Sequence, residues 1–452
     1  MGSVQRGKRV AFIGLGYVGL ATALCLASKG FKVLGIEVDR RKVKLIGDGI
    51  SPIHERGLAP LLRSSVKRKN LIPQTDFVGL KQCDVVFVTV GTPSLDDGGI
   101  DSRFVESASV EIGRQLSDTT GYQLIVVKST VTPGTTEGLV RKTIERESGK
   151  KAGRDFGLAS NPEFLHEGSA IQETFHPDAL VIGGHDRRSS ATLRRMYAAF
   201  YGTLPPTIMT SPSNAEMMKY AVNAGRAAQV SYINTIANFC SRVPGCDYDE
   251  VRKGLSLVAK MDQRYLSAGL GFGGSCLPKD TRALAAALGS AGVSNESVAT
   301  AMRVNEGQVD EAIRLAETLC GPLNGKKVSV LGLAFKPDTD DVRESVSISL
   351  AIALLKKDAS VAVYDPAAMD NARMLLGNRV TYAKTELDCL AGSECTFIAT
   401  GWERFKKIKP KDFRTRMASP VVIDGRRLYD QDSLLKGGVS VATIGTGPRS
   451  DN

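Results

Sequence analysis

The sequence has few of the residues that build metal sites or disulfide scaffolds. Its four histidines show no H-x-x-x-H or other metal-ligand spacing, and its eight cysteines include no C-x-x-C pair. Several of the cysteines stand in apolar helix or strand patterns, which suits reduced thiols inside a core. We therefore expect neither a metal site nor a framework of disulfides.

Long apolar segments and nucleic-acid-binding motifs are also missing. No run of about 18 apolar residues occurs, and the first residues lead directly into a strand pattern instead of a signal peptide. The net charge is +11, but the 59 lysines and arginines are dispersed, without a helix-turn-helix, RNP or zinc-finger pattern. We expect a cytoplasmic protein that does not bind membranes or nucleic acid, and whose partners are small anions.

Length and composition indicate a globular protein of more than one domain. The chain has 452 residues, of which 42% are apolar and 24% charged. Alternating strand and helix patterns predict an α/β fold in which two Rossmann-like, doubly wound parallel-sheet domains are joined by a long central helix. We place the domains at residues 1–205, 206–315 and 316–452.

The first strand–turn–helix–strand unit carries a dinucleotide-binding motif. The strand Arg9–Ile13 leads into G-L-G-Y-V-G and an apolar helix, and the strand Lys32–Ile36 follows. Glycines occupy three motif positions: Gly14, Gly16 and Gly19. Glu37 closes the second strand, where an acid can bind the adenosine ribose and repel a 2′-phosphate, so NAD is expected over NADP. An exposed acid at a strand end is the alternative for Glu37.

Polar turns follow the later strands of this domain. Strands are predicted at Val85–Val90, Leu124–Val127, Gly157–Ala159 and Ala179–Ile182. The turns after the first three are Gly91-Thr92-Pro93, Ser129-Thr130 and Asn161-Pro162-Glu163. Ligands of doubly wound sheets bind at such strand ends, although each turn alone could be a helix cap.

A helix of roughly 28 residues is predicted from Ser213 to Cys240. Lys219 and Asn223 are four positions apart and share one face of it. A solvated face is the alternative reading for these two residues. The helix is rich in Ala, Val and Ile, so we expect it also to pack against a second subunit.

The segment G-L-G-F-G-G-S-C-L-P-K-D, Gly269 to Asp280, contains one cysteine beside unusually bare backbone. Its glycines allow a ligand to approach closely. Pro278 suits a first helical position, so Cys276 should lie at a helix N-terminus, which favours the thiolate. A small buried thiol after a glycine-rich turn is the alternative.

The last section predicts a second α/β domain. Strands are expected at Val328–Leu331, Ser360–Tyr364, Cys395–Ala399 and Val421–Ile423. Cations at or near their ends suit a diphosphate, with solvated surface charge as the alternative. These cations are Lys336, Arg343, Arg426 and Arg427. The tail from Gly445 to Asn452 is expected to be disordered.

Six motifs in order carry a family resemblance over residues 7–430. They are G-L-G-Y-V-G-L, S-N-P-E-F-L-H-E-G-S-A, N-A-E-M-M-K-Y-A-V-N-A, G-F-G-G-S-C-L-P-K-D, G-L-A-F-K-P-D-T-D-D-V-R-E-S and D-G-R-R. Together they resemble the UDP-glucose and GDP-mannose dehydrogenase family. The resemblance implies an NAD-binding domain, a central dimerisation region and a domain for a nucleotide sugar. The expected substrate is UDP-glucose, and the expected assembly is a homodimer or higher homo-oligomer.

The implied reaction oxidises the sugar C6 hydroxyl to a carboxylate. Cys276 would form a thiohemiacetal and then a thioester, while Lys219 and Asn223 stabilise negative oxygen. The resemblance assigns Asp280 and Thr130 to a water and proton-relay network with Lys219, and Glu163 to base catalysis of thioester hydrolysis.

The resemblance also implies two binding sets. Cofactor contacts are expected at Gly14, Gly16, Tyr17, Val18, Gly19, Glu37, Lys42, Thr92, Pro93, Thr130, Glu167, Lys279 and Arg343. Substrate contacts are expected at Glu163, Phe164, Leu165, Lys219, Asn223, Tyr265, Leu266, Gly273, Phe335, Lys336 and Arg426. Helix capping is a competing role for Glu167.

Two positions depart from the family pattern. The chain is short between Asp262 and Tyr265, where family members often carry an arginine that reaches a neighbouring subunit, and Arg264 could replace it. Glu37 stands where aspartate is commoner, which should preserve NAD selectivity.

Three other functions remain open from the sequence. A dehydrogenase for GDP-mannose or an N-acetylated UDP sugar would use the same motifs. A sensor of nucleotide sugars would not need Cys276, Lys219, Asn223 and Asp280 together. A β-hydroxyacid dehydrogenase would leave Cys276 and the second α/β domain without a purpose.

Overall fold

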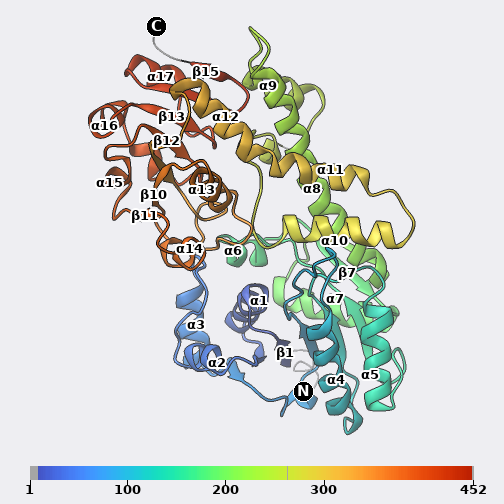
Figure 1. Cartoon of the computed structure of the whole chain (residues 1–452). Helices are drawn as coiled ribbons and strands as arrows, with labels where there is room; N and C mark the ends of the chain where they lie inside the picture. Colours follow the sequence, from blue (N-terminus) through green and yellow to red (C-terminus); the bar gives the residue numbers. More distant parts are fainter. Residues whose placement is uncertain (1–8, 262, 450–452) are drawn as a thin grey trace. The chain divides into compact units, whose positions relative to one another are not determined.

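The computed structural model describes residues 9–261 and 263–449, and the chain divides into two compact units, residues 1–222 and 223–452 (Figure 1). The side chains of residue 264 and residues 447–449 are outside the description. Each unit is built around one sheet.

The sheet of the first unit has eight strands in the order β3-β2-β1-β4-β5-β6-β7-β8. Their bounds are β1 Arg9–Ile13, β2 Lys32–Ile36, β3 Leu71–Gln74, β4 Val85–Val88, β5 Leu124–Val127, β6 Gly157–Ser160, β7 Leu180–Gly184 and β8 Thr207–Thr210. Strands β1 to β6 are parallel, whereas β7 pairs antiparallel with β6 and parallel with β8. The first six positions have the order of a dinucleotide-binding sheet.

Helices cover both faces of this sheet. Their bounds are α1 Tyr17–Ser28, α2 Arg40–Gly47, α3 Leu58–Lys67, η1 Leu80–Gln82, α4 Arg103–Ser117, η2 Thr136–Val140, α5 Arg141–Ser148, α6 Ala170–Phe175 and α7 Arg187–Tyr201. Alternate strand residues point to opposite faces. On one face, residues such as Phe12 and Phe87 pack with α1, α3, α6 and α7. On the other face, residues such as Ile13 and Val88 pack with α4 and α5. The predicted double winding is confirmed.

The sheet of the second unit has seven strands in the order β11-β10-β9-β12-β13-β14-β15. Their bounds are β9 Lys327–Leu331, β10 Ser360–Tyr364, β11 Thr381–Tyr382, β12 Cys395–Ile398, β13 Val421–Asp424, β14 Ser440–Thr443 and β15 Gly447–Arg449. Only β15 runs antiparallel among the described strands of this sheet, and it pairs with β14. The prediction of a disordered tail is therefore wrong for residues 447–449, while residues 450–452 lie outside the description.

The remaining helices include the long one that the sequence predicts. Their bounds are α8 Pro212–Cys240, α9 Tyr248–Val258, η3 Gln263–Tyr265, α10 Leu277–Ser290, α11 Glu296–Glu306, α12 Gln308–Cys320, α13 Val346–Lys356, α14 Met369–Leu376, α15 Glu386–Leu390, η4 Phe405–Lys407, α16 Pro410–Arg416 and α17 Gln431–Lys436. Helix α8 has 29 residues, and the two units divide within it at Val222 and Asn223. Among the described helices, none is both long enough and apolar enough to span a membrane.

Candidate active site

The loop between β1 and α1 leaves open space beside a helix N-terminus. Gly14 has φ +97°, and a Cβ on Gly19 would lie 2.0 Å from the carbonyl oxygen of Gly14, so α1 packs closely on the loop. Among the described residues, no heavy atom would lie within 4 Å of a Cβ on Gly16, and no side chain caps the first turn of α1, which begins with Tyr17 and Val18. These N–H groups can therefore receive the pyrophosphate of a dinucleotide.

Glu37 is held at the end of β2 by two backbone donors. Its Oε2 accepts a hydrogen bond from the N–H of Leu15 at 3.1 Å, and its Oε1 accepts one from the N–H of Asp39 at 3.2 Å. The side chain is buried. Lys42 lies in the first turn of α2, next in the chain. The loop and this carboxylate fit NAD, because the N–H groups of α1 can bind its phosphates and the Glu37 carboxylate can accept hydrogen bonds from its ribose hydroxyls.

Two predicted cofactor residues meet where β4 and β5 end. The hydroxyl of Thr92 donates to the carbonyl oxygen of Thr130 at 2.8 Å, and Pro93 follows Thr92 in the chain. Thr92 is buried, while Thr130 is half-buried. The hydroxyl of Ser129 donates to the carbonyl oxygen of Val90 at 2.7 Å. The turns after the two strands are thus joined by hydrogen bonds.

Glu163 and Lys219 form a buried ion pair in the first unit. The Lys219 Nζ lies 3.0 Å from the Glu163 Oε1 and donates to the Glu163 carbonyl oxygen at 2.6 Å. The N–H of Leu165 donates to the Glu163 Oε2 at 2.5 Å, and the ring centroid of Phe164 lies 5.3 Å from the Lys219 Nζ. Four predicted substrate-site residues, Glu163, Phe164, Leu165 and Lys219, therefore meet at this ion pair.

The charge of this pair is stabilised against burial. Burial alone would raise the pKa of Glu163, but the charge of Lys219, the N–H of Leu165 and the charge of Lys128 lower it below its usual value. Glu163 is therefore an ionised carboxylate at neutral pH, which is the form that accepts a proton from water.

Lys128 is a residue of this region that our sequence analysis missed. It directly follows β5 and is buried, and its Nζ donates to the Asn161 Oδ1 at 3.1 Å. Burial lowers its pKa to about 8, an effect that Glu163 opposes and Lys219 increases. A lone lysine ending the apolar run L-I-V-V was the signal that could have identified it.

The loop that carries Glu163 is also tied to the cofactor loop. The N–H of Gly168 donates to the Tyr17 hydroxyl at 2.6 Å and to the Glu55 Oε2 at 2.7 Å. Glu167 is half-buried beside Gly168. Glu55, which our sequence analysis also missed, thus links the segment before α3 to the turn that carries Glu167.

In the second unit, Cys276 lies at the N-terminus of α10. It is the N-cap residue of this helix and is exposed, and Pro278 stands in the first turn, as the sequence predicts. The other seven cysteines are buried or half-buried. The Cys276 Sγ lies 3.6 Å from the Ser275 Oγ. Helix N-terminal N–H groups and their dipole favour a thiolate at this position.

Asn223, Asp280 and Lys279 form a hydrogen-bonded group in the same unit. The Asn223 Nδ2 donates to the Asp280 Oδ2 at 2.6 Å, and the Lys279 Nζ lies 2.6 Å from the Asp280 Oδ1. Both Asn223 and Asp280 are buried. Asp280 belongs to the first turn of α10 and is therefore held one turn from Cys276.

The glycines before Cys276 are needed for close packing. A Cβ on Gly273 would lie 2.2 Å from the Glu344 carbonyl oxygen, and one on Gly274 would lie 2.6 Å from the ring of Phe335. Gly274 also has φ +87°. Lys336 follows Phe335, and its Nζ lies 5.7 Å from that ring's centroid. The Cys276 loop and the loop after β9 thus bring three predicted substrate residues together, Gly273, Phe335 and Lys336.

Two further predicted substrate residues precede the glycine loop. Tyr265 ends η3, and its ring centroid lies 5.2 Å from the Arg226 guanidinium carbon. Leu266 is buried, and its carbonyl oxygen accepts a hydrogen bond from the Tyr248 hydroxyl at 2.7 Å. The intersubunit role expected for Arg264 concerns a side chain that lies outside the described part of the structure. Asp262 also lies outside it.

The arginines of the second unit have different surroundings. Arg343 makes a bidentate ion pair with Asp341, with a shortest distance of 2.6 Å. Arg426 donates to the carbonyl oxygens of Ala399 and Gly271, and its Nη2 is buried without a hydrogen-bond partner among the described residues. Burial lowers the pKa of Arg426 to about 10. A buried unpaired donor suits a ligand acceptor.

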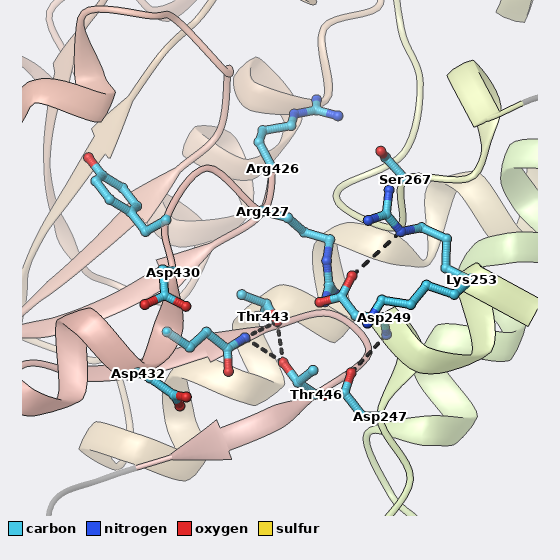
Figure 2. A pocket seen from close by; sticks show the side chains of 13 residues that line it. Asp247, Asp249, Lys253, Ser267, Arg426, Arg427, Asp430, Asp432, Thr443 and Thr446 are labelled. Atoms are coloured by element: carbon cyan, nitrogen blue, oxygen red, sulfur yellow. Dashed lines mark hydrogen bonds and ion pairs between the residues drawn. The ribbon is translucent and has the colours of Figure 1, made fainter.

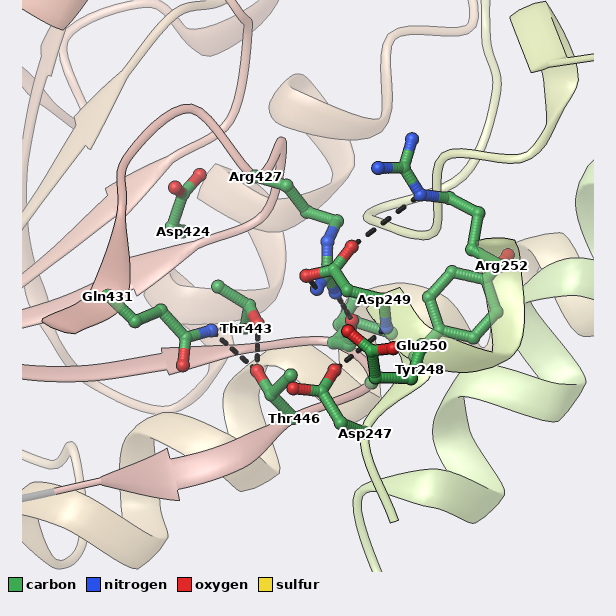
Figure 3. A network of polar contacts seen from close by, with 12 residues as sticks. Asp247, Tyr248, Asp249, Glu250, Arg252, Asp424, Arg427, Gln431, Thr443 and Thr446 are labelled. Atoms are coloured by element: carbon green, nitrogen blue, oxygen red, sulfur yellow. Dashed lines mark hydrogen bonds and ion pairs between the residues drawn. The ribbon is translucent and has the colours of Figure 1, made fainter. Parts of the chain in front are cut away.

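Arg427 points away from its neighbour Arg426 (Figure 2). Its guanidinium pairs with Asp249 of α9 (Figure 3). It also donates to the Ile444 carbonyl oxygen at 2.6 Å. Both arginines line a cavity of about 430 Å³ that also contains Asp247, Asp430 and Asp432 (Figure 2). The diphosphate role considered for Arg427 stays a prediction, and its surroundings offer it no support, because its guanidinium is engaged with a carboxylate and acids line the same cavity.

Comparison with known proteins covers nearly the whole chain. Three models of the UDP-glucose/GDP-mannose dehydrogenase family match: the NAD binding domain over residues 8–201, the central domain over 213–307 and the UDP binding domain over 329–431. The chain belongs to this family. It is accordingly an NAD-dependent dehydrogenase, and the β1–α1 loop belongs to its NAD-binding domain.

Similar relatives act on two nucleotide sugars. The chain is 37% identical to UDP-glucose 6-dehydrogenase TuaD of Bacillus subtilis, over 97% of this chain and 93% of that one. It is 42% identical to GDP-mannose 6-dehydrogenase of Pseudomonas putida, over 79% and 80%. The structure of a UDP-glucose dehydrogenase from Pyrobaculum islandicum matches with a TM-score of 0.88 at 37% identity, covering 99% of this chain and 100% of that one.

Proposed function

We propose that this enzyme oxidises UDP-glucose to UDP-glucuronate, reducing two NAD⁺ and consuming one water. The observation that carries this proposal is the exposed Cys276 at the N-terminus of α10, in a family that includes the UDP-glucose 6-dehydrogenase TuaD, which is 37% identical to this chain over 97% of its length. Bound NAD⁺ accepts one hydride in each of the two oxidation steps.

Cys276 supplies the nucleophile between the two oxidations. The first oxidation converts the C6 alcohol to an aldehyde, and the Cys276 sulfur adds to its carbonyl carbon to give a thiohemiacetal. Loss of the C6 hydride then gives a thioester, which water hydrolyses to the carboxylate and the free thiol. The overall reaction releases three protons, so the surrounding residues must accept them in turn.

The remaining residues have charges that suit these steps. The Lys219 ammonium and the Asn223 amide are donors that would stabilise the oxyanions of the hemiacetal and of thioester hydrolysis. Asp280, Thr130 and Lys219 would relay protons, and the ionised Glu163 would accept a proton from the attacking water. Arg426 has a buried donor without a partner among the described residues, which would bind the nucleotide, and Lys336 would supply a second cation.

We also propose a homodimer or larger assembly formed along α8. Residues at helical spacing on this helix are exposed: Gly225, Ala228, Tyr232, Thr235 and Phe239. Tyr232 is 52% exposed and Phe239 is 66% exposed. A stripe of small and aromatic residues is typical of a helix that packs against a second helix. The cytoplasm, which supplies NAD and nucleotide sugars, is the expected location.

The experiment that tests the function is the amount of NADH formed per molecule of nucleotide sugar. UDP-glucose should give two NADH per molecule, whereas an alcohol dehydrogenase would give one and a sensor none. UDP-galactose, UDP-N-acetylglucosamine, UDP-N-acetylmannosamine and GDP-mannose are tested in parallel. If GDP-mannose has the higher kcat/KM, the proposed sugar specificity is wrong.

A further inference from the structure

Lys128 is a buried cation that the reaction described above does not use. It is 7% exposed and follows the last residue of β5, and its own N–H donates to the Val88 carbonyl oxygen at 2.9 Å. A buried ammonium is costly unless it is hydrogen-bonded and compensated by charge. Its surroundings therefore indicate a role beyond packing.

Hydrogen bonds hold the Lys128 ammonium against the segment that leads to Glu163. Its Nζ donates to the Asn161 Oδ1 at 3.1 Å and to the Asn161 carbonyl oxygen at 3.4 Å. The Tyr197 hydroxyl donates to the same Oδ1 at 2.5 Å, and the Asn161 Nδ2 donates to the Val181 carbonyl oxygen at 2.7 Å. Asn161 is fully buried. The Lys128 ammonium is therefore held by a residue that precedes Glu163 by two positions in the chain.

Two charged groups act on Lys128 from the elements packed around it. Glu163, from the loop after β6, attracts the ammonium, while Lys219, from α8, repels it. In turn, Lys128 and Lys219 both lower the pKa of Glu163. One buried carboxylate is thus balanced by two buried cations, of which only Lys219 contacts it directly.

We propose that Lys128 is a positioning residue of the reaction, whose fixed charge keeps the Glu163 carboxylate ionised while the thioester is hydrolysed. The proposal rests on the proposed function. It gives the second cation a distinct purpose: the Lys219 ammonium is also assigned to the oxyanion, so its charge is shared, whereas Lys128 is hydrogen-bonded only to Asn161 among the described residues.

The test measures thioester hydrolysis by itself. With enzyme in excess over UDP-glucose, the interval between the second NADH and the release of UDP-glucuronate in quenched samples gives the hydrolysis rate. Cys276 carries the acyl group during this interval and does not titrate, so the acid limb of the pH profile reports Glu163. In Lys128→Met this limb should move to higher pH by about one unit, because a cation near the carboxylate has been removed.

Three variants separate charge from packing. Lys128→Arg keeps the cation and should leave the acid limb at the wild-type pH. Tyr197→Phe removes a hydrogen bond to the same Asn161 Oδ1 without changing charge, so its limb should also stay at the wild-type pH. Lys128→Gln can still donate to Asn161 and replaces Lys128→Met if that variant does not fold. A purely structural lysine would lower stability in all variants and shift no limb.

A second readout does not depend on turnover. The infrared band of protonated Glu163, identified by its loss in Glu163→Gln, should appear at higher pH in Lys128→Met than in the wild type. If folded Lys128→Met shows the wild-type limb and band midpoint, or if Lys128→Arg shifts them equally, the proposal is overturned. If the wild type forms no thioester but the band shifts, the proposed function fails while the influence of Lys128 on Glu163 stands.

Discussion

At the scale of single residues, a substitution of Cys276 distinguishes a role in covalent catalysis from a role in packing. In Cys276→Ser, oxygen replaces a good nucleophile and leaving group, so kcat should fall by about a thousandfold or more, with binding of NAD and UDP-glucose retained. Initial rates measure kcat, and calorimetry measures the binding of NAD and UDP-glucose. Cys389→Ser is the matched control, because this thiol is fully buried: it should lose about 1–3 kcal/mol of stability and keep its kcat per folded chain. A near-normal kcat in Cys276→Ser contradicts the covalent route.

We expect Glu37 to determine the preference for NAD over NADP. Its carboxylate is fixed by two backbone N–H groups and cannot swing away easily from a 2′-phosphate. The unpaired like charge should give at least about a 100-fold preference for NAD over NADP in kcat/KM. Glu37→Gln, which removes the charge and retains the shape, should reduce this preference. Equal kcat/KM values for the two cofactors in the wild type would refute the prediction.

Lys128 should also make stability depend on pH. Its pKa is about 8 when folded and 10.5 ordinarily, so between these values the unfolded chain binds more protons than the folded chain. Stability from this residue therefore rises as the pH increases from about 8 to about 10.5. The melting temperature of Lys128→Met, relative to the wild type, should be highest near pH 7.5 and decline toward pH 10.5. A difference that is constant with pH contradicts it.

At the scale of elements, local patterns predicted most strands and the long helix. Continuous apolar runs such as Leu124–Val127 identify strands buried on both faces, and the observed bounds agree. The reversed direction of β7 was missed, because pairing direction depends on where the chain returns and not on the strand's own residues. The strand β15 was missed because Gly447 and Pro448 are poor strand formers, and only the partner β14 supplies the pairing.

In the candidate site, too, local sequence patterns identified some residues, while residues that depend on distant partners were missed. The glycine-rich segment indicated Cys276, helical spacing indicated Lys219 and the family resemblance implied the role of Glu163, but Lys128 depends on Asn161, which lies 33 positions away in the sequence. The ion pair of Arg427 was missed for the same reason: its partner Asp249 is 178 positions away. Long-range ion pairs of this kind carry no local sequence pattern, so charge alone did not distinguish a ligand-binding arginine from a structural one.

Arg427 should stabilise the second unit by holding two of its elements together. It pairs with Asp249 of α9 (Figure 3) and donates to the carbonyl oxygen of Ile444, the residue after β14. Arg427→Ala should therefore lower the unfolding free energy by about 1–3 kcal/mol and leave the KM for UDP-glucose unchanged. Arg427→Gly should cost less, because residue 427 has φ +53° and glycine adopts this conformation readily. Denaturation measures the unfolding free energy, and initial rates measure the KM for UDP-glucose. A large rise in KM would instead indicate that Arg427 binds the substrate.

At the scale of the whole molecule, the exposed stripe of α8 predicts self-association. The chain should be at least a dimer at micromolar concentration, as measured by light scattering. Phe239→Glu places a charge in the stripe and should shift the mass toward the monomer. Leu257→Glu, at a residue of α9 that is 79% exposed and outside the stripe, is the control and should not. A fully active wild-type monomer would exclude assembly along this helix.

The exposure of Cys276 has a practical consequence for counting working molecules. Since the other seven thiols are buried or half-buried, a thiol-directed reagent at limiting concentration should modify one sulfur per chain first. Bound nucleotide sugar should protect it, if the sugar covers the loop. The amount of label incorporated while activity disappears would then be a titre of competent active sites. Such a titre converts measured rates into turnover per functional chain, whatever fraction of a preparation is inactive.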